Sequence, residues 1–146
     1  MSIGTWETIE LNTKPAEGFP NPVYYFDVTQ QLRDAVPADA GNGVMHVFVP
    51  HTTCTLIFNS GVDGTTLHDI RLYMERAVPV TGPFVHLWDG PQDAAAHIRC
   101  IFGVQSLTLP IKDGKLDIGH SQGVYFLELD GPRDRTVRYA VAPFGR

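Results

Sequence analysis

Six histidines spread along a chain of 146 residues are the side chains best suited to chemistry in this sequence. A neutral imidazole binds zinc and related metals, and catalytic sites use three protein ligands with one position left open. No H-x-x-x-H or H-E-x-x-H spacing occurs, so a metal site requires histidines that are distant in sequence to meet in space. The histidines that we consider candidates for such a site are His51, His68, His86 and His97.

Two of the histidines also have structural interpretations. His46 lies inside the apolar segment 44–49, where we expect a buried, hydrogen-bonded histidine rather than a ligand. His51 opens the run His51-Thr52-Thr53, and these polar residues could do no more than satisfy backbone groups at a turn. A site and a turn are equally consistent with this run alone.

Carboxylates accompany the candidate histidines along the chain. An aspartate can orient an imidazole or bind a hard cation. Asp63 precedes a helical segment and is better placed to cap it, whereas Asp89 and Asp93 are consistent with solvated loop charges. The nearby aspartates are Asp63, Asp69, Asp89 and Asp93.

The turn at 130–135 carries two arginines, Arg133 and Arg135. A guanidinium group suits phosphate or carboxylate, because its fork of donors matches their oxygens. On these residues alone a solvated hairpin is the better interpretation. The glycine-bounded loop at 119–123 lacks the lysine and the spacing of a P-loop.

Composition excludes several classes of function. The net charge of −5 and the pI of about 5.6 disfavour binding to nucleic acid, which requires a basic face. No apolar run approaches the roughly 20 residues that cross a bilayer, and the N-terminus does not resemble a signal peptide. Cys54 and Cys100 lie in apolar segments, and we expect buried free thiols in a reducing cytoplasm rather than a disulfide.

The polar run at 51–53 is positioned by the elements on either side of it. An apolar, β-branched strand at 44–49 leads into it, and a second strand leaves it. A helix over 64–77 then brings His68 and Asp69, and its apolar residues recur at helical spacing. A further helix over 91–102 carries His97 in its middle.

The remaining chain is rich in strands. The Asp113-Gly114 pair is its strongest hairpin signal. Strands and helices are segregated rather than alternating, so we expect one α+β domain over residues 1–146 with a mostly antiparallel sheet. Further strands are predicted at 5–11, 23–28, 106–111, 116–119, 124–129 and 136–142, a loop at 12–22, and a short helix at 30–36 that Thr29 caps.

Several short motifs follow one another along the chain: His51-Thr52-Thr53, Asn59, Asp63, His68-Asp69, His86, His97-Ile98, residues 106–111, Asp113-Gly114-Lys115, Gly119 and Gln122-Gly123. This ordered set is far more specific than any one motif, and it resembles the YjbQ family, whose members are also called secondary thiamine-phosphate synthases. The resemblance extends from about residue 5 to residue 142.

The resemblance implies a fold and a type of site. The fold would be a single compact α+β domain with a curved, mostly antiparallel sheet or sandwich and two or three helices. The assembly would be a homotrimer with sites near subunit boundaries. Each site would hold a divalent metal, zinc or magnesium, or an anion such as a phosphate-bearing substrate. The residues carried across are His51, Asn59, Asp63 and Asp69 for catalysis, Thr52, Gln122 and Arg133 for ligand binding, and His68, His86 and His97 for the metal.

The sequence departs from the family pattern at three places. Where the family has Asn-Glu, Asn59 is followed by Ser60, so a carboxylate that could transfer protons is absent. The usual Asp-Pro is replaced by Asp63-Gly64. The usual Gly-Thr-Trp-Gln is replaced by residues 119–122, which lack the tryptophan. We therefore expect a divergent member with reduced or altered catalysis.

Three hypotheses follow from the sequence. The first is a transferase of the thiamine-phosphate synthase type that uses a metal. The second is a trimer that binds a metal or a small anion without turnover. The third is an oligomeric scaffold whose histidines are structural.

Overall fold

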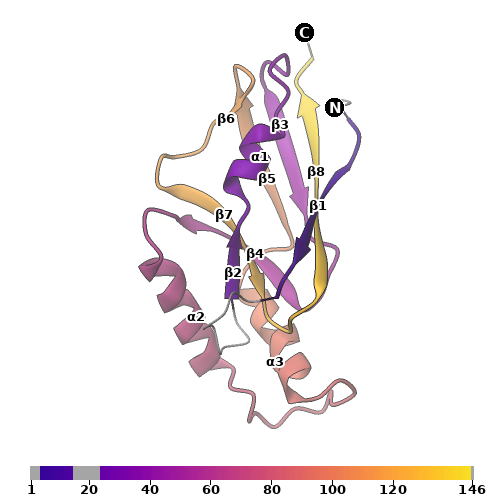
Figure 1. Cartoon of the computed structure of the whole chain (residues 1–146), viewed down its shortest axis with the longest axis vertical. Coiled ribbons are helices and arrows are strands. Elements are labelled where there is room, and N and C mark those ends of the chain that lie inside the picture. The colour runs from indigo at the N-terminus through magenta and orange to yellow at the C-terminus, as the bar shows by residue number, and fades with distance from the viewer. Residues whose placement is uncertain (1–3, 15–23, 146) are drawn as a thin grey trace.

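Two antiparallel sheets packed face to face form the frame of the protein (Figure 1). The computed structural model describes residues 4–14 and 24–145. The first sheet has the order β1 (Glu7–Asn12), β8 (Asp134–Pro143), β3 (Gly43–Phe48), β5 (Ser106–Lys112) and β6 (Lys115–Leu116). The second has the order β2 (Tyr24–Asp27), β7 (Gln122–Glu128) and β4 (Cys54–Ser60).

The core lies between the sheets because alternate residues of each strand point inward. Met45 and Val47 of β3 are fully buried, and so are Leu56 of β4 and Phe126 of β7. In the smaller sheet the second face is also buried, because Ile57, Tyr125 and Leu127 pack with helical residues such as Leu67 and Ala96. In the larger sheet the exposed residues of β3 and β5 form an outer face. His46 is one of these, so the expected buried histidine is wrong: the side chain lies on the outer face, where its Nδ1 is 3.1 Å from the Thr108 hydroxyl.

Three helices and a 3-10 turn complete the described fold: α1 (Thr29–Asp34), α2 (Thr65–Ala77), α3 (Pro91–Arg99) and η1 (Cys100–Phe102). In Figure 1, α2 and α3 lie toward the lower end of the sheets, away from the β6 hairpin and the C-terminus. The α3–η1 pair spans the predicted helix at 91–102. No helix of the described residues is long and apolar enough to cross a membrane.

The predicted α+β fold with antiparallel pairing is confirmed, and the local errors have physical causes. Thr29 is the first residue of α1 rather than its cap, because its hydroxyl is hydrogen bonded to the backbone of Val124. The hairpin at Asp113-Gly114 forms with positive φ angles of 49° and 71°, but its return strand is only β6. The first residue of the predicted strand at 23–28 and most of the predicted loop at 12–22 lie outside the described residues.

Candidate functional site

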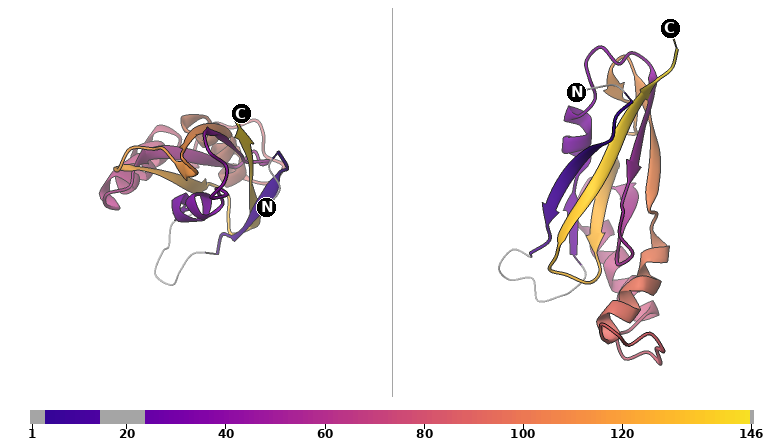
Figure 2. Two further views of the ribbon diagram at one scale, coloured as in Figure 1. Left: turned by 90° about the horizontal axis from the view of Figure 1, so that it is seen from above. Right: turned by 90° about the vertical axis from the view of Figure 1, so that its right-hand side faces the viewer.

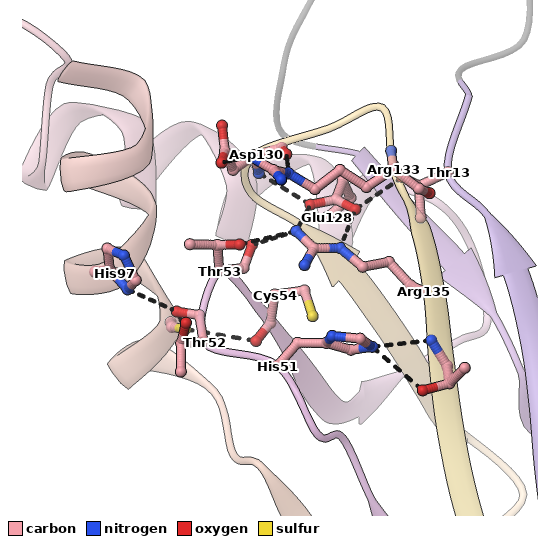
Figure 3. Close-up of polar contacts among 12 residues, drawn as sticks. Thr13, His51, Thr52, Thr53, Cys54, His97, Glu128, Asp130, Arg133 and Arg135 are labelled. Carbon is pink, nitrogen blue, oxygen red and sulfur yellow. Dashed lines mark hydrogen bonds and ion pairs between the residues drawn. The ribbon is translucent and has the colours of Figure 1, made fainter. Parts of the chain in front are cut away.

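The corner between β3 and β4 is tied to α3 through one backbone carbonyl. The Thr52 oxygen accepts a hydrogen bond from Nδ1 of His97 at 3.2 Å and another from the Cys100 thiol at 3.0 Å (Figure 3). The neighbouring Thr53 and Cys54 are buried. The segment between β3 and β4 is therefore held against α3 at the Thr52 carbonyl, and His97 is part of this contact.

His86, Asp93 and His97 converge at the start of α3. Asp93 and His97 are four residues apart and lie on the same side of the helix. The Nε2 atoms of His86 and His97 are each 3.2 Å from Oδ2 of Asp93, and the two rings meet edge to face with centroids 5.1 Å apart. One ligand atom from each residue lies within 4.8 Å of the other two. We call these three residues the open cluster, because the His86 side chain is 50% exposed while that of Asp93 is 7% exposed.

The tautomer of His97 follows from its backbone contact. A carbonyl oxygen can only accept, so Nδ1 of His97 carries a hydrogen that it donates to Thr52. In the neutral ring, Nε2 then presents a lone pair toward the Asp93 carboxylate, which is also an acceptor. Two acceptors at 3.2 Å require a proton or a cation between them. Metal-binding histidines commonly have this arrangement, with the second nitrogen held by a carbonyl.

A second carboxyl group continues the polar chain behind the open cluster. Asp130 is hydrogen bonded to Asp93, and Nη2 of Arg133 donates to Oδ2 of Asp130 at 2.7 Å. Burial raises the pKa of Asp130, and the adjacent Asp93 carboxyl adds to that rise. Burial also acts to raise the pKa of Asp93, but the Asp130 hydrogen bond and the two imidazoles outweigh it and hold the pKa below its usual value. The pKa values of the two neighbouring carboxyl groups are therefore shifted in opposite directions.

Glu128 and Arg135 form a second polar group that is closed to solvent. Nε and Nη2 of Arg135 donate to the two Glu128 oxygens at 2.8 and 2.7 Å (Figure 3). The Thr13 hydroxyl donates to Glu128, and the Thr53 hydroxyl accepts from Arg135. All four residues are at most 6% exposed, and we call them the closed network. The predicted solvated hairpin is therefore wrong for Arg135.

His51 is attached to β8 by a backbone contact. Its Nε2 accepts the amide hydrogen of Thr136 at 3.0 Å, so Nδ1 carries the proton of the neutral ring. Burial lowers the pKa of His51, and the positive charge of Arg135 lowers it further. A cavity of about 320 Å³ separates His51 from His97 and is also lined by Cys100. A second cavity of about 510 Å³ adjoins His86 and His97 on the other side.

The other predicted site residues lie at the far end of β4. Six residue steps separate Cys54 from Ser60, roughly 20 Å at the rise of a strand. Asn59 bonds to the Ser60 amide, and Gln122, opposite Ser60 in β7, bonds to the Gly119 amide. Within one chain the ten residues thus form two groups, and the roles predicted for them stay predictions.

The helix that follows carries the rest of this far group. Asp63 accepts the Thr65 amide hydrogen at 2.8 Å and so caps the first turn of α2, although Gly64 occupies the N-cap position. His68 lies one turn further on, with Nδ1 at 3.4 Å from Arg71, and Asp69 is exposed beside it. No described contact joins His68 to the other candidate histidines.

Sequence reasoning missed the residues at the centre of both polar groups. The sequence favours a solvated charge at Asp93, yet this carboxylate is buried and contacts both histidines of the open cluster. Its spacing of four residues from His97 inside a predicted helix was the signal that could have identified it. Nothing local marks Glu128 or Asp130, because their partners come from other elements.

Comparison with known proteins places this architecture in a family. The family model described as UPF0047 protein YjbQ-like matches residues 7–143. A UPF0047 protein of Archaeoglobus fulgidus is 36% identical over 130 residues, which cover 88% of this chain and 96% of that protein. The YjbQ protein of Salmonella typhimurium is 31% identical over 122 residues, covering 83% of this chain and 84% of that protein.

Solved structures agree with the sequence comparison. The crystal structure of a YjbQ/UPF0047 family protein from Clostridium acetobutylicum superposes with a TM-score of 0.81 at 31% identity, covering 92% of this chain and 98% of that one. A hypothetical protein of Aeropyrum pernix gives a TM-score of 0.82 at 26% identity, with 96% and 99% coverage. The fold is therefore shared with solved members of the family, and the chain belongs to the YjbQ/UPF0047 family.

Proposed function

We propose that this protein binds a divalent transition metal through His86, Asp93 and His97 and presents it to a phosphate-bearing small molecule. The observation that carries the proposal is the approach of three ligand atoms to within 4.8 Å of one another. Two imidazoles and one carboxylate suit zinc better than magnesium, which prefers oxygen ligands and keeps several waters. The Thr52 carbonyl holds His97 in the tautomer that such a ligand needs.

The surroundings of the open cluster favour an anionic ligand. A cavity of about 510 Å³ beside His86 and His97 is in the size range of small-molecule sites. Arg133 is linked to the cluster through Asp130, and half of its side chain is exposed. A bound metal would supply positive charge at the cluster, and Arg133 would add a second positive group nearby. A phosphate is the ligand class that this charge pattern suits.

The reaction that we propose is of the thiamine-phosphate synthase type. A thiazole phosphate nitrogen would form a bond to the methylene carbon of a pyrimidine diphosphate, and the carbon–oxygen bond to diphosphate would break. The diphosphate departs with the electron pair, so positive groups that bind it favour the step. Ser60 stands where the family has a glutamate, and we therefore expect slow turnover.

Binding without turnover is the alternative, in a homotrimer with sites near subunit boundaries. Exposed apolar side chains beside the open cluster support self-association, since Val85 is 98% exposed, Trp88 90% and Ile101 77%. Sedimentation of the purified protein measures this directly. A species of three chains is expected, and a monomer at all concentrations would contradict it.

Metal analysis tests the proposed site. Protein equilibrated with zinc and then desalted should retain about one ion per chain, and His97→Ala or Asp93→Asn should retain little. His120→Ala removes an exposed histidine elsewhere and is the matched control. Equal zinc content in the wild type and in a His86→Ala, His97→Ala double variant would exclude the cluster.

A product assay then separates the two functions. Zinc-loaded protein is incubated with the pyrimidine diphosphate and thiazole phosphate, and boiled protein is the control. Product above the control supports the transferase. Retained zinc without product supports binding alone.

A further inference from the structure

The outer face of the larger sheet contains a hollow that is separate from both cavities at His97. Its volume is about 600 Å³, and it is lined from four directions: by Trp6 ahead of β1, and by residues of β3, β5 and β8. It shares no lining residue with the cavities beside His97. In the right-hand view of Figure 2 this face of β1, β8, β3 and β5 is turned toward the reader, with no helix in front of it.

Strand register brings aromatic and cationic groups together in this hollow. Phe48 of β3 lies opposite Arg138 of β8 on one side and Ser106 of β5 on the other. The Arg138 guanidinium lies 5.5 Å from the centroid of the Trp6 ring. Trp6 is 49% exposed and Phe48 37% exposed, so both rings keep an accessible face. The guanidinium therefore lies over one aromatic ring, and a second aromatic residue stands opposite Arg138 on the neighbouring strand.

The polar groups of the hollow can pair with a bound anion. Among the residues that the structure describes, no carboxylate lies in ion-pair range of Arg138. Glu10 is exposed on the same face of the sheet and makes no ion pair with it. Two residues from Phe48 along β3, and on the same face, His46 lies opposite Thr108 and bonds to its hydroxyl. The protein has a net charge of −5, yet Arg138 has no carboxylate partner among the described residues, and two partly exposed aromatic side chains lie beside it.

We propose that this hollow binds a small planar aromatic carboxylate. The carboxylate would accept two hydrogen bonds from the Arg138 fork, which is the geometry that arginine offers to carboxylates. The ring of the ligand would pack against Trp6 and Phe48 in an offset or edge-to-face arrangement. His46, Ser106 and Thr108 supply hydrogen-bonding groups at the margin of the hollow. This site does not depend on the proposed metal cluster.

Titration of the full chain with 1-naphthoate tests the site. Amide chemical shifts measured by NMR should move at Phe48, Thr108 and Arg138 and stay fixed at His97. Arg138→Gln should weaken binding by roughly tenfold or more, since it removes a charged hydrogen-bonding partner. Arg33→Gln removes an exposed arginine on α1 and should bind like the wild type.

A neutral probe makes the test independent of any variant. 1-Naphthamide has the same rings without the charge, so it should bind the wild type at least several-fold more weakly than 1-naphthoate. Equal affinity for the two probes would overturn the proposal. Chemical-shift changes confined to the cavities beside His97 would also overturn it. So would the absence of binding at millimolar probe, whether or not a second copy of the chain covers the face.

Discussion

The closed network and the open cluster each contain a buried carboxylate, yet the two carboxylates differ in their hydrogen-bonding partners and in the exposure of those partners. In the closed network, the Glu128 carboxylate accepts hydrogen bonds from two Arg135 nitrogens and from the Thr13 hydroxyl, and every partner is buried. In the open cluster, one carboxylate faces two imidazole nitrogens, and one of the imidazoles is half exposed. The first group is complete within the chain, whereas the second brings three possible metal-ligand atoms together at the surface.

This difference separates a structural role from a binding role. A buried ion pair with all its oxygens bonded holds elements together, here β7, β8 and the corner at Thr53. Converging acceptors at a surface cost energy unless a proton or an ion joins them. The closed network should therefore control stability, and the open cluster should control ligand affinity.

The largest expected effect is the loss of stability in Arg135→Met. The change leaves the Glu128 carboxylate buried without its cation, which costs about 3–5 kcal/mol of unfolding free energy. Urea unfolding measures it. The Glu128→Leu, Arg135→Met double variant should recover much of that loss, because neither charge of this ion pair remains buried.

The matched control for this comparison is His86→Ala in the open cluster. It should change the unfolding free energy by less than about 1 kcal/mol, since the side chain is half exposed. A larger loss in His86→Ala than in Arg135→Met would break the distinction between the two groups.

The two cysteines should differ in reactivity, because one lies beside the closed network and the other lines a cavity. Burial raises the pKa of Cys54, next to the closed network, to about 12. Burial also raises the pKa of Cys100, which nevertheless lines the cavity between His51 and His97. Iodoacetamide at pH 8 should modify Cys100 faster than Cys54, because Cys54 is fully buried and its thiolate is about a thousandfold scarcer than that of an ordinary cysteine.

Peptide mapping by mass spectrometry measures the two rates in one sample. The Cys54→Ser and Cys100→Ser variants identify each modified peptide. Equal rates in the native protein and in 6 M guanidinium would show that neither thiol is protected.

Asp130→Asn should weaken the proposed metal site without removing a ligand. The Asp130 carboxyl lies beside Asp93 and accepts from Nη2 of Arg133, so the substitution weakens the link between the Asp93 carboxylate and a positive group. Loss of such an outer partner typically costs 10- to 100-fold in metal affinity. Competition with a zinc chelator measures the change, and Asp134→Asn is a control on an exposed carboxylate nearby. Unchanged affinity would assign Asp130 to the structure rather than to the site.

The elements of the fold were predictable from local patterns. The apolar alternation of β3, the Asp113-Gly114 turn and the helix that begins at Pro91 each depend on residues within one segment. His46 was misassigned because period two alone does not say which face of a strand is buried. Its outward direction follows only once β3 is placed between β5 and β8.

The candidate site was predictable in part, for the same reason. His86 and His97 were identified by residue type and by family motif, and the structure brings their rings together. The pairing of Glu128 with Arg135 joins β7 of one sheet to β8 of the other, and the link from Asp93 to Asp130 joins a helix to a distant turn. Such contacts leave no spacing in the sequence that could reveal them.

The smallest expected effect concerns His51, which lies between the two groups. Burial and Arg135 lower its pKa below the ordinary value of 6.5, so the folded protein keeps it neutral where the unfolded chain takes up a proton. The stability that this provides is complete above pH 6.5 and is lost as the pH falls toward the lowered pKa in the folded state. In His51→Gln, which retains an acceptor for the Thr136 amide, unfolding free energy should fall less between pH 7.5 and pH 5 than in the wild type. His120→Gln is the control, and urea unfolding at each pH is the measurement. A wild-type slope in His51→Gln would mean that burial and Arg135 do not lower the pKa of this imidazole in the folded protein.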